Sequence, residues 1–163
     1  DIAWTGPDGL PDAVIALERI QDPGNLGTIL RTADAAGAGA VLLSPECCDP
    51  YAPKAVRGAM GSVFRVPLYR AKHFAEAMDV CRAAGYEILA GTLDGENVFA
   101  AEALPSRFVL MIGNEASGLS AAAVHAATRK LRVPMTGGAE SLNAGVAAGV
   151  LLYTLLRAQL RTL

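Results

Sequence analysis

The amino-acid sequence predicts an α/β domain with a mostly parallel sheet flanked by helices. Apolar runs of strand length alternate with helical patterns about six times along the chain, which is typical of this class. The run 108–112, Phe-Val-Leu-Met-Ile, is wholly apolar, as expected for a strand buried on both faces of a parallel sheet. The chain of 163 residues is close to the size of one domain, so we expect a single core.

The first half of the chain begins with a segment rich in turn-forming residues. Residues 1–12 contain glycine, proline and acidic side chains, so we expect a tail or the end of a linker there and the domain itself at residues 13–163. The apolar run 13–20 begins a core strand, followed by a loop at 21–25 and a helix at 26–36 that stops at Gly37. The next expected elements are a strand at 40–43, a helix at 54–60, an extended segment at 63–68 and an amphipathic helix at 71–84.

The second half continues the alternation of strands and helices. A strand at 86–89 is expected to end at Gly91-Thr92, and Asp94-Gly95 indicates a turn. Ser141 is expected to open a long helix rich in Ala, Val and Leu, because serine is a preferred N-cap residue. The other expected elements are the strand 108–112, a loop at 113–119, a helix at 120–128 and a strand at 131–135 that ends before Gly137-Gly138.

Composition limits the class of protein. Apolar residues make up 52% of the chain and charged residues only 18%, so the surplus apolar surface is expected to lie in a subunit interface. The longest uncharged run, 141–156, is shorter than the roughly 20 apolar residues of a membrane-spanning helix, and we expect no membrane segment. Cys47, Cys48 and Cys81 fit neither a disulfide framework nor a zinc site, which indicates reduced thiols in a cytoplasmic protein. The net charge of −2 lacks a basic footprint, so an RNA partner would be held by a local patch or by another domain.

Three loops that follow apolar strands form the candidate binding site. Residues 21–27 with Arg31, residues 113–119 and residues 136–143 each combine glycine with Asn and a hydroxyl or charged group. In open α/β folds, ligands bind in such loops at the carboxyl ends of the strands. Arg31 stands in an otherwise apolar helix start, where its guanidinium could hold a phosphate. From the residues alone, ordinary turns and an exposed helix charge remain open as alternatives.

Other cofactor sites are disfavoured by the order of the motifs. Gly37-Ala38-Gly39 follows a helix and precedes a strand, the reverse of a dinucleotide-binding motif, which argues against a NAD-type reductase. The sequence has no Walker A motif and no His/Cys cluster, so we expect no metal.

Taken together, the three loops resemble the three motifs of the SpoU (TrmH-like) family of RNA ribose 2′-O-methyltransferases, within the SPOUT class. The matching stretches are QDPGNLG with RTA at 31–33, MIGNE with GL at 118–119, and VPM followed by ESLN at 140–143. The stretch KAVRGAMGSVF at 54–64 is also similar to the family, and the resemblance spans residues 14–156.

The resemblance implies the SPOUT fold, an α/β domain whose C-terminal third forms a trefoil knot. It implies S-adenosylmethionine as cofactor, S-adenosylhomocysteine as product, and a homodimer in which part of each active site is supplied across the interface. The implied activity is methylation of a ribose 2′-hydroxyl in tRNA or rRNA. The alternative is a non-catalytic RNA- or nucleotide-binding module of the same fold.

The resemblance also implies roles for single residues. The implied cofactor-binding residues are Thr92, Ile112, Gly113, Asn114, Val133, Met135, Leu142, Asn143 and Ala144. The implied catalytic residues are Arg31, Asn25, Glu115, Ser141 and Asn143. Deprotonating a free arginine near pH 7 would cost roughly 7 kcal/mol, so we prefer a role in which Arg31 binds a phosphate and stabilises the developing alkoxide. Asn25 would orient Arg31 or the ribose, and Glu115 would orient the active-site loop or a partner cation. Ser141 and Asn143 would shape the pocket.

The chain departs from the family pattern in two places. Ala144 and Gly145 stand where family members often carry Val and Ser, which loosens packing rather than removing chemistry. Many family members also carry an N-terminal RNA-binding domain, whereas only about a dozen residues precede the first expected strand here. Either that domain is missing from this sequence, or the catalytic dimer recognises RNA alone.

Overall fold

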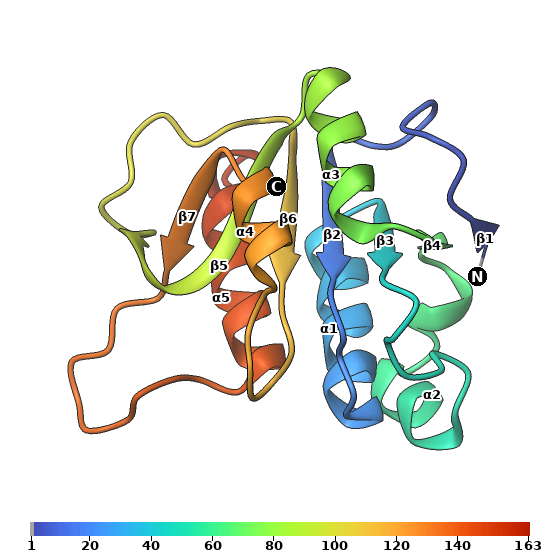
Figure 1. The fold of residues 1–163 in the computed structure, drawn as a ribbon. Helices are drawn as coiled ribbons and strands as arrows, with labels where there is room; N and C mark the ends of the chain where they lie inside the picture. Colours follow the sequence, from blue (N-terminus) through green and yellow to red (C-terminus); the bar gives the residue numbers. More distant parts are fainter. Residues whose placement is uncertain (1) are drawn as a thin grey trace.

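A computed structural model describes residues 2–163, so the expectation for Asp1 lies outside the described residues. The strands are β1 Ile2–Ala3, β2 Ala13–Leu17, β3 Ala40–Leu43, β4 Leu68–Arg70, β5 Glu87–Asn97, β6 Phe108–Ile112 and β7 Arg129–Arg132. They form one sheet in the order β1-β4-β3-β2-β6-β5-β7, and every pair is parallel (Figure 1). The expected α/β fold with a parallel sheet is therefore confirmed.

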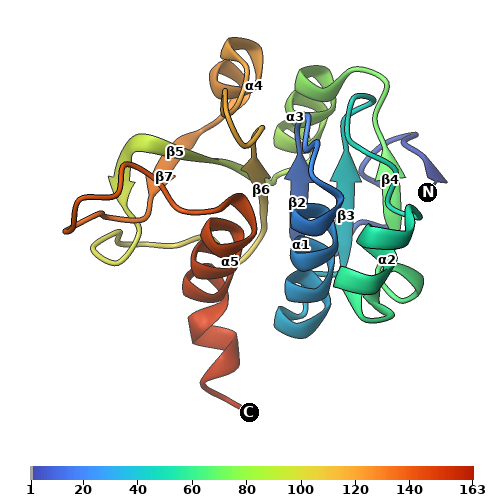
Figure 2. The same ribbon diagram turned by 90° about the horizontal axis from the view of Figure 1, so that it is seen from below.

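Helices cover both faces of this sheet (Figure 2). They are α1 Pro23–Ala36, α2 Pro53–Ala59, α3 Phe74–Ala83, α4 Ala121–Ala126 and α5 Ala144–Leu160, with a 3₁₀ turn η1 at Ser62–Phe64. The helices α1, α2 and α5 lie on one face, and α3 and α4 lie on the other. Within residues 2–163, no helix has both the length and the apolarity needed to cross a bilayer.

The central strands are apolar at successive positions because both faces of the sheet are buried. Ile15 and Leu17 of β2 belong to the core cluster shared with α1 and α5, whereas Val14 and Ala16 belong to the cluster shared with α3 and α4. Side chains of a strand point alternately to the two faces, so one apolar run supplies both layers. The predicted bounds of β3 and β6 are confirmed for the same reason.

Helix α1 begins earlier than the sequence predicted. The carboxylate of Asp22 accepts the N–H of Gly24 at 2.7 Å, and Pro23 occupies the first helical position, where its missing N–H costs nothing. Asn25 therefore lies in the first turn of α1, and the expected loop at 21–25 is wrong beyond Asp22. The other helices begin or end within a few residues of their predicted bounds.

The expected extended segment at 63–68 is wrong. Residues Ser62–Phe64 form the turn η1, and the strand β4 starts only at Leu68. The turn buries Val63 and allows the Ser62 hydroxyl to donate to the carboxylate of Asp34 at 2.7 Å. A contact with a distant helix thus overrides the local preference for an extended chain.

The expected turn at Asp94-Gly95 is also wrong, because β5 continues to Asn97. The strand pairs with β7 on both sides of an irregularity between Gly91 and Glu96. Ion pairs from Lys130 to Asp94, at 2.8 Å, and from Arg129 to Glu96, at 2.9 Å, hold the polar C-terminal part of β5 against β7. The predicted strand 131–135 is displaced to Arg129–Arg132 and ends before Pro134, which lacks the N–H that a strand needs.

The first described residues, where we expect a tail or the end of a linker, contact the edge of the sheet. Ile2 and Ala3 form β1 and pair with β4 at the edge of the sheet. The hydroxyl of Tyr86 donates to the carbonyl oxygens of Leu10 and Pro11, at 2.9 and 3.1 Å. This segment is therefore attached to the domain at both ends.

Candidate functional site

A cavity of about 370 Å³ lies at the carboxyl ends of β5, β6 and β7 and reaches the start of α5. This volume is within the range of small-molecule sites, and the position is the one where ligands bind in open parallel sheets. Its walls come from Gly91–Leu93 after the regular part of β5, from residues 112–119, and from the segment that joins β7 to α5. Two of the three predicted loops therefore form this cavity.

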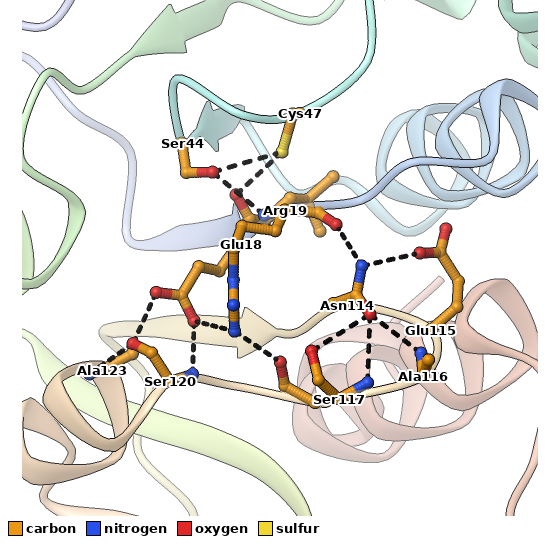
Figure 3. Close-up of polar contacts among 12 residues, drawn as sticks. Glu18, Arg19, Ser44, Cys47, Asn114, Glu115, Ala116, Ser117, Ser120 and Ala123 are labelled. Carbon is orange, nitrogen blue, oxygen red and sulfur yellow. Dashed lines mark hydrogen bonds and ion pairs between the residues drawn. The ribbon is translucent and has the colours of Figure 1, made fainter.

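Within the 113–119 loop, the side chain of Asn114 bonds to several neighbouring residues. Its Oδ1 accepts the N–H groups of Ala116 and Ser117, each at 3.0 Å, and the Ser117 hydroxyl at 3.1 Å (Figure 3). Asn114 and Gly118 also exchange two backbone hydrogen bonds, at 2.9 and 3.1 Å. Gly113 allows this closure, because a Cβ atom there would lie 2.2 Å from the carbonyl carbon of Gly118. The loop is thus closed on itself by its own hydrogen bonds.

Glu115 connects the 113–119 loop to the start of α1. Its carboxylate accepts the N–H of Asp22 at 3.0 Å, the N–H of Gln21 at 3.2 Å and the side-chain amide of Asn25 at 3.3 Å. Partial burial raises the pKa of Glu115, but the N–H groups of Asp22 and Gln21 and the amide of Asn25 outweigh it, so the pKa lies below its usual value. Glu115 is therefore an anion at neutral pH that holds two loops together.

Asn25 extends this connection to the third loop. Its Oδ1 accepts the side-chain amide of Asn143, which lies 118 residues further along the chain, at 2.8 Å. The Oδ1 of Asn143 in turn accepts the N–H groups of Gly145 and Val146, at 2.8 and 3.2 Å. A continuous chain of hydrogen bonds thus joins Glu115, Asn25 and Asn143.

Asn143, not Ser141, is the N-cap of α5, which corrects the predicted cap. Both residue types cap helices well. Asn143 has a second partner in Asn25, so its side chain satisfies the helix start and joins two loops at once. Ser141 is exposed and lies at the wall of the cavity.

Arg31 lies apart from the cavity within one chain. It is exposed on α1, less than two turns after Asn25, and makes no hydrogen bond or ion pair among residues 2–163. The helix start therefore brings Asn25 into the network and leaves Arg31 on the surface. Of the five residues expected in catalysis, Glu115 and Ser141 line the cavity, and Asn25 and Asn143 support its walls.

Most residues expected at the cofactor line the same cavity. They are Thr92, Ile112, Gly113, Asn114, Val133, Met135, Leu142 and Ala144, and only Asn143 is not among the lining residues. The hydroxyl of Thr92 is buried, and Lys130 and this hydroxyl hold the pKa of Asp94 below its usual value. The cavity therefore offers apolar walls and a buried polar group.

Two residues beside the cavity were missed from the sequence. The sequence pattern places Glu18 and Arg19 in the apolar run 13–20, whereas β2 ends at Leu17. The side chain of Arg19 bonds to Gly118, and that of Glu18 bonds to Ser120 just after the loop. Their sequence signal is a charged pair at the end of an otherwise apolar run. Among residues 2–163, no group of three or more His, Cys, Asp or Glu side chains is arranged to hold a metal ion.

Comparisons with known proteins agree with this arrangement. The model of the SpoU rRNA Methylase family matches residues 12–153. The 23S rRNA (guanosine(2553)-2′-O)-methyltransferase RlmP of Bacillus subtilis is 39% identical over 142 residues, which are 87% of this chain and 57% of that protein. This chain therefore spans less than two thirds of that relative.

Solved structures give the same result. The AdoMet-bound rRNA methyltransferase from Sinorhizobium meliloti is 39% identical, with a TM-score of 0.84 over 94% of this chain and 59% of its own. A structure solved for insight into 2-OH methylation of C/U34 on tRNA is 29% identical, with a TM-score of 0.75 over 93% of this chain and 97% of its own.

Proposed function

Because this chain belongs to the SpoU rRNA methylase family, we propose that it transfers a methyl group from S-adenosylmethionine to a ribose 2′-hydroxyl of rRNA or tRNA. One observation carries the proposal: eight of the nine residues that the family motifs assign to the cofactor line a single cavity at the carboxyl edge of the sheet. Relatives with the same fold are named for both classes of RNA, so both substrates stay within the proposal.

The lining of the cavity suits S-adenosylmethionine. Ile112, Leu142 and Leu151 give apolar surface, and Thr92 adds a buried hydroxyl to the lining. Backbone groups of the 113–119 loop supply further polar contacts. When bound, S-adenosylmethionine supplies an electrophilic methyl group on a sulfonium. The protein then has to hold the ribose in line with that methyl group and assist loss of the hydroxyl proton.

We assign Arg31 to the RNA rather than to the cofactor. It is an exposed cation without an internal partner among the described residues, so it is free to bind a phosphate bidentately and to stabilise the developing alkoxide. Asn25, Glu115 and Asn143 bond to one another, which supports a role in positioning the loops. Ser141 lies at the wall of the cavity, where its hydroxyl can contact the ribose.

Arg31 does not line the cavity of its own chain. It could act on a ligand only if a second copy of the chain brought it to that copy's cavity, as in a homodimer. The exposed side of α5 carries apolar side chains: Val146 and Tyr153 are 50% and 43% exposed. Burial of such a surface against a second copy is favourable and fits the low charge of the sequence. We therefore propose that the functional unit is a dimer with composite active sites.

The proposal includes the trefoil knot of the family. It is supported by the path of the chain after β7, since residues 133–142 share the cavity with the 113–119 loop and then lead to α5 on the other face of the sheet from α4. We also propose that the protein is cytoplasmic, because its three cysteines are free thiols. Recognition of a particular RNA would use a further domain, in keeping with the 57% of RlmP that this chain covers.

The test is calorimetric titration of the folded chain with S-adenosylhomocysteine, followed by turnover measured with S-adenosylmethionine and RNA. We expect saturable binding at about one site per subunit. The variant Arg31→Ala should bind S-adenosylhomocysteine as the wild type does and lose most of its turnover, by about a hundredfold if a charge-assisted contact in the transition state is removed. A folded protein that binds no S-adenosylhomocysteine would point instead to a non-catalytic module, and wild-type turnover of Arg31→Ala would exclude the role given to Arg31.

A further inference from the structure

The residue Arg19, just after β2, has an unusual backbone. Its φ angle is +56°, in the left-handed region that residues with a Cβ atom adopt at a cost in free energy. Glycine or asparagine would adopt this conformation more easily. An arginine in such a position leads us to ask what its backbone and side chain contact.

The backbone of Arg19 contacts two separate loops. Its N–H donates to the hydroxyl of the fully buried Ser44 at 3.0 Å, and its carbonyl oxygen accepts the side-chain amide of Asn114 at 2.8 Å (Figure 3). Asn114 is the residue whose other side-chain atom shapes the 113–119 loop. The left-handed turn therefore directs a carbonyl oxygen at the centre of that loop.

The side chain of Arg19 reaches the far end of the same loop. A terminal nitrogen of its guanidinium donates to the carbonyl oxygen of Gly118 at 3.3 Å and lies 4.0 Å from the carboxylate of Glu18. Glu18 is buried and accepts the N–H and the hydroxyl of Ser120, at 2.7 and 2.6 Å. Glu18 and Arg19 together thus hold Asn114, Gly118 and Ser120 from one point at the end of β2.

We infer that Arg19 is a positioning residue for the cofactor: with Glu18, it fixes the shape of the wall formed by residues 113–119. This inference rests on the proposed function, since it takes S-adenosylmethionine as the ligand of that wall. Arg19 does not line the cavity, so it acts through Asn114 and Gly118, which do. A wall that the protein itself holds in one shape reduces the entropy lost when a ligand binds.

The test compares three variants of the full chain. Arg19→Gly keeps the left-handed backbone and removes the guanidinium, and Arg19→Lys keeps one charged donor. Ala103→Gly is the matched control, because Ala103 is exposed, has a φ angle of +48° and lies outside the cavity. Glu18→Gln is the second approach if Arg19→Gly does not fold.

We expect Arg19→Gly to weaken binding of S-adenosylhomocysteine about tenfold, the loss that corresponds to one charge-assisted hydrogen bond. The KM for S-adenosylmethionine should rise by a similar factor and the KM for RNA should stay unchanged. Amide hydrogen exchange at residues 116–118 should accelerate in Arg19→Gly while exchange in the central strands is unaltered. Arg19→Lys should recover most of the affinity, and Ala103→Gly should match the wild type.

The outcomes separate this inference from the proposed function. If the wild type binds S-adenosylhomocysteine and both Arg19→Gly and Glu18→Gln bind it equally well, the positioning role is wrong and the proposed function stands. If the wild type itself does not bind, both fail. An equal loss of affinity in Ala103→Gly would also overturn the inference, since the effect would then come from a left-handed backbone position and not from the guanidinium.

Discussion

The two walls of the cavity are built in opposite ways. The 113–119 loop is tied by the side chains of Asn114, Glu115 and Arg19 and by paired backbone bonds between Asn114 and Gly118. The facing segment, residues 133–142, makes no hydrogen bond to another described residue, and its residues 136–142 are all exposed. One wall is held by the protein's own hydrogen bonds, and the other lacks such bonds among the described residues.

This difference gives the two walls different effects on ligand binding. A preformed wall contributes affinity because no ordering is needed when the ligand arrives. A loosely held wall costs affinity, because fixing the backbone of each residue takes roughly 1–2 kcal/mol, but it allows the ligand to enter and leave. The walls meet where Asn143 bonds to Asn25, and that junction limits how far the loose wall can move.

The largest effect should come from a substitution at Gly113, in the wall formed by residues 113–119. In Gly113→Ala the new Cβ would lie 2.2 Å from backbone atoms of Gly118 and Leu119, so the closed loop has to open. We expect a loss of stability of about 3 kcal/mol from overpacking and a fall in S-adenosylhomocysteine affinity of about a hundredfold. Thermal unfolding and calorimetric titration measure these two quantities.

The control for Gly113→Ala lies in the loose wall. A Cβ atom at Gly138 would meet nothing within 4 Å, so Gly138→Ala should keep its affinity within about twofold of the wild type. Equal losses in the two variants would mean that the walls do not differ in the way the hydrogen bonds indicate.

A smaller effect is expected at the junction of the walls. Asn143→Ala removes the N-cap of α5 and the partner of Asn25, at a cost of about 2 kcal/mol from both together. Ser141→Ala, two residues earlier, removes an exposed hydroxyl that caps nothing and should change the stability by less than about 0.5 kcal/mol. Chemical denaturation of the pair measures the difference, and a reversed order would show that Ser141 is the cap in solution.

Ser141 and Asn143 also show which structural features can be predicted from the sequence and which cannot. The strands β3 and β6 follow from local apolar runs, and their bounds need no information from elsewhere. The choice between Ser141 and Asn143 as the cap could not be made from the sequence, since both are good caps and the deciding partner, Asn25, is 118 residues away. The polar extension of β5 was missed for a similar reason, because distant ion pairs with Arg129 and Lys130 hold it in the sheet.

The site shows the same limit. The resemblance gathers residues that share a local segment, and eight of the nine that it assigns to the cofactor line one cavity. It did not predict that Arg31 would lie away from the cavity or that Arg19 would hold the loop. Both facts depend on helix phase and on a single left-handed backbone position, which no pattern of residue types encodes.

The bond between Glu115 and α1 can be tested by pH. The pKa of Glu115 is lowered below its usual 4.5, so its stabilising contribution is present above pH 4.5 and is lost as the pH falls through the folded-state pKa. Glu115→Gln should cost about 1 kcal/mol at pH 7, a modest figure because the carboxylate is partly solvated. The gap between variant and wild type should shrink as the pH falls from 4.5 toward the folded-state pKa, below which the wild-type side chain is neutral in the folded state too. Urea unfolding at pH 7 and pH 3.5 measures both values, and a gap that widens in acid would contradict the assignment.

The smallest effect should come from restricting the backbone of the other wall, residues 133–142, by replacing its glycines. Gly137 and Gly138 do not have positive φ angles, and a Cβ atom at either would meet nothing within 4 Å, so the double variant G137A/G138A fits the structure. Alanine restricts the unfolded chain more than glycine does, and we expect a gain of about 1 kcal/mol, or about 2–4 °C in Tm. If residues 133–142 bind the ligand in their present conformation, the double variant should bind S-adenosylhomocysteine as tightly as the wild type or slightly more tightly. A clear loss of affinity with the same gain in stability would show that the wall must adopt a different backbone around the ligand, one that only glycine allows. In that case residues 113–119 would form a fixed surface, and residues 133–142 would close around the ligand.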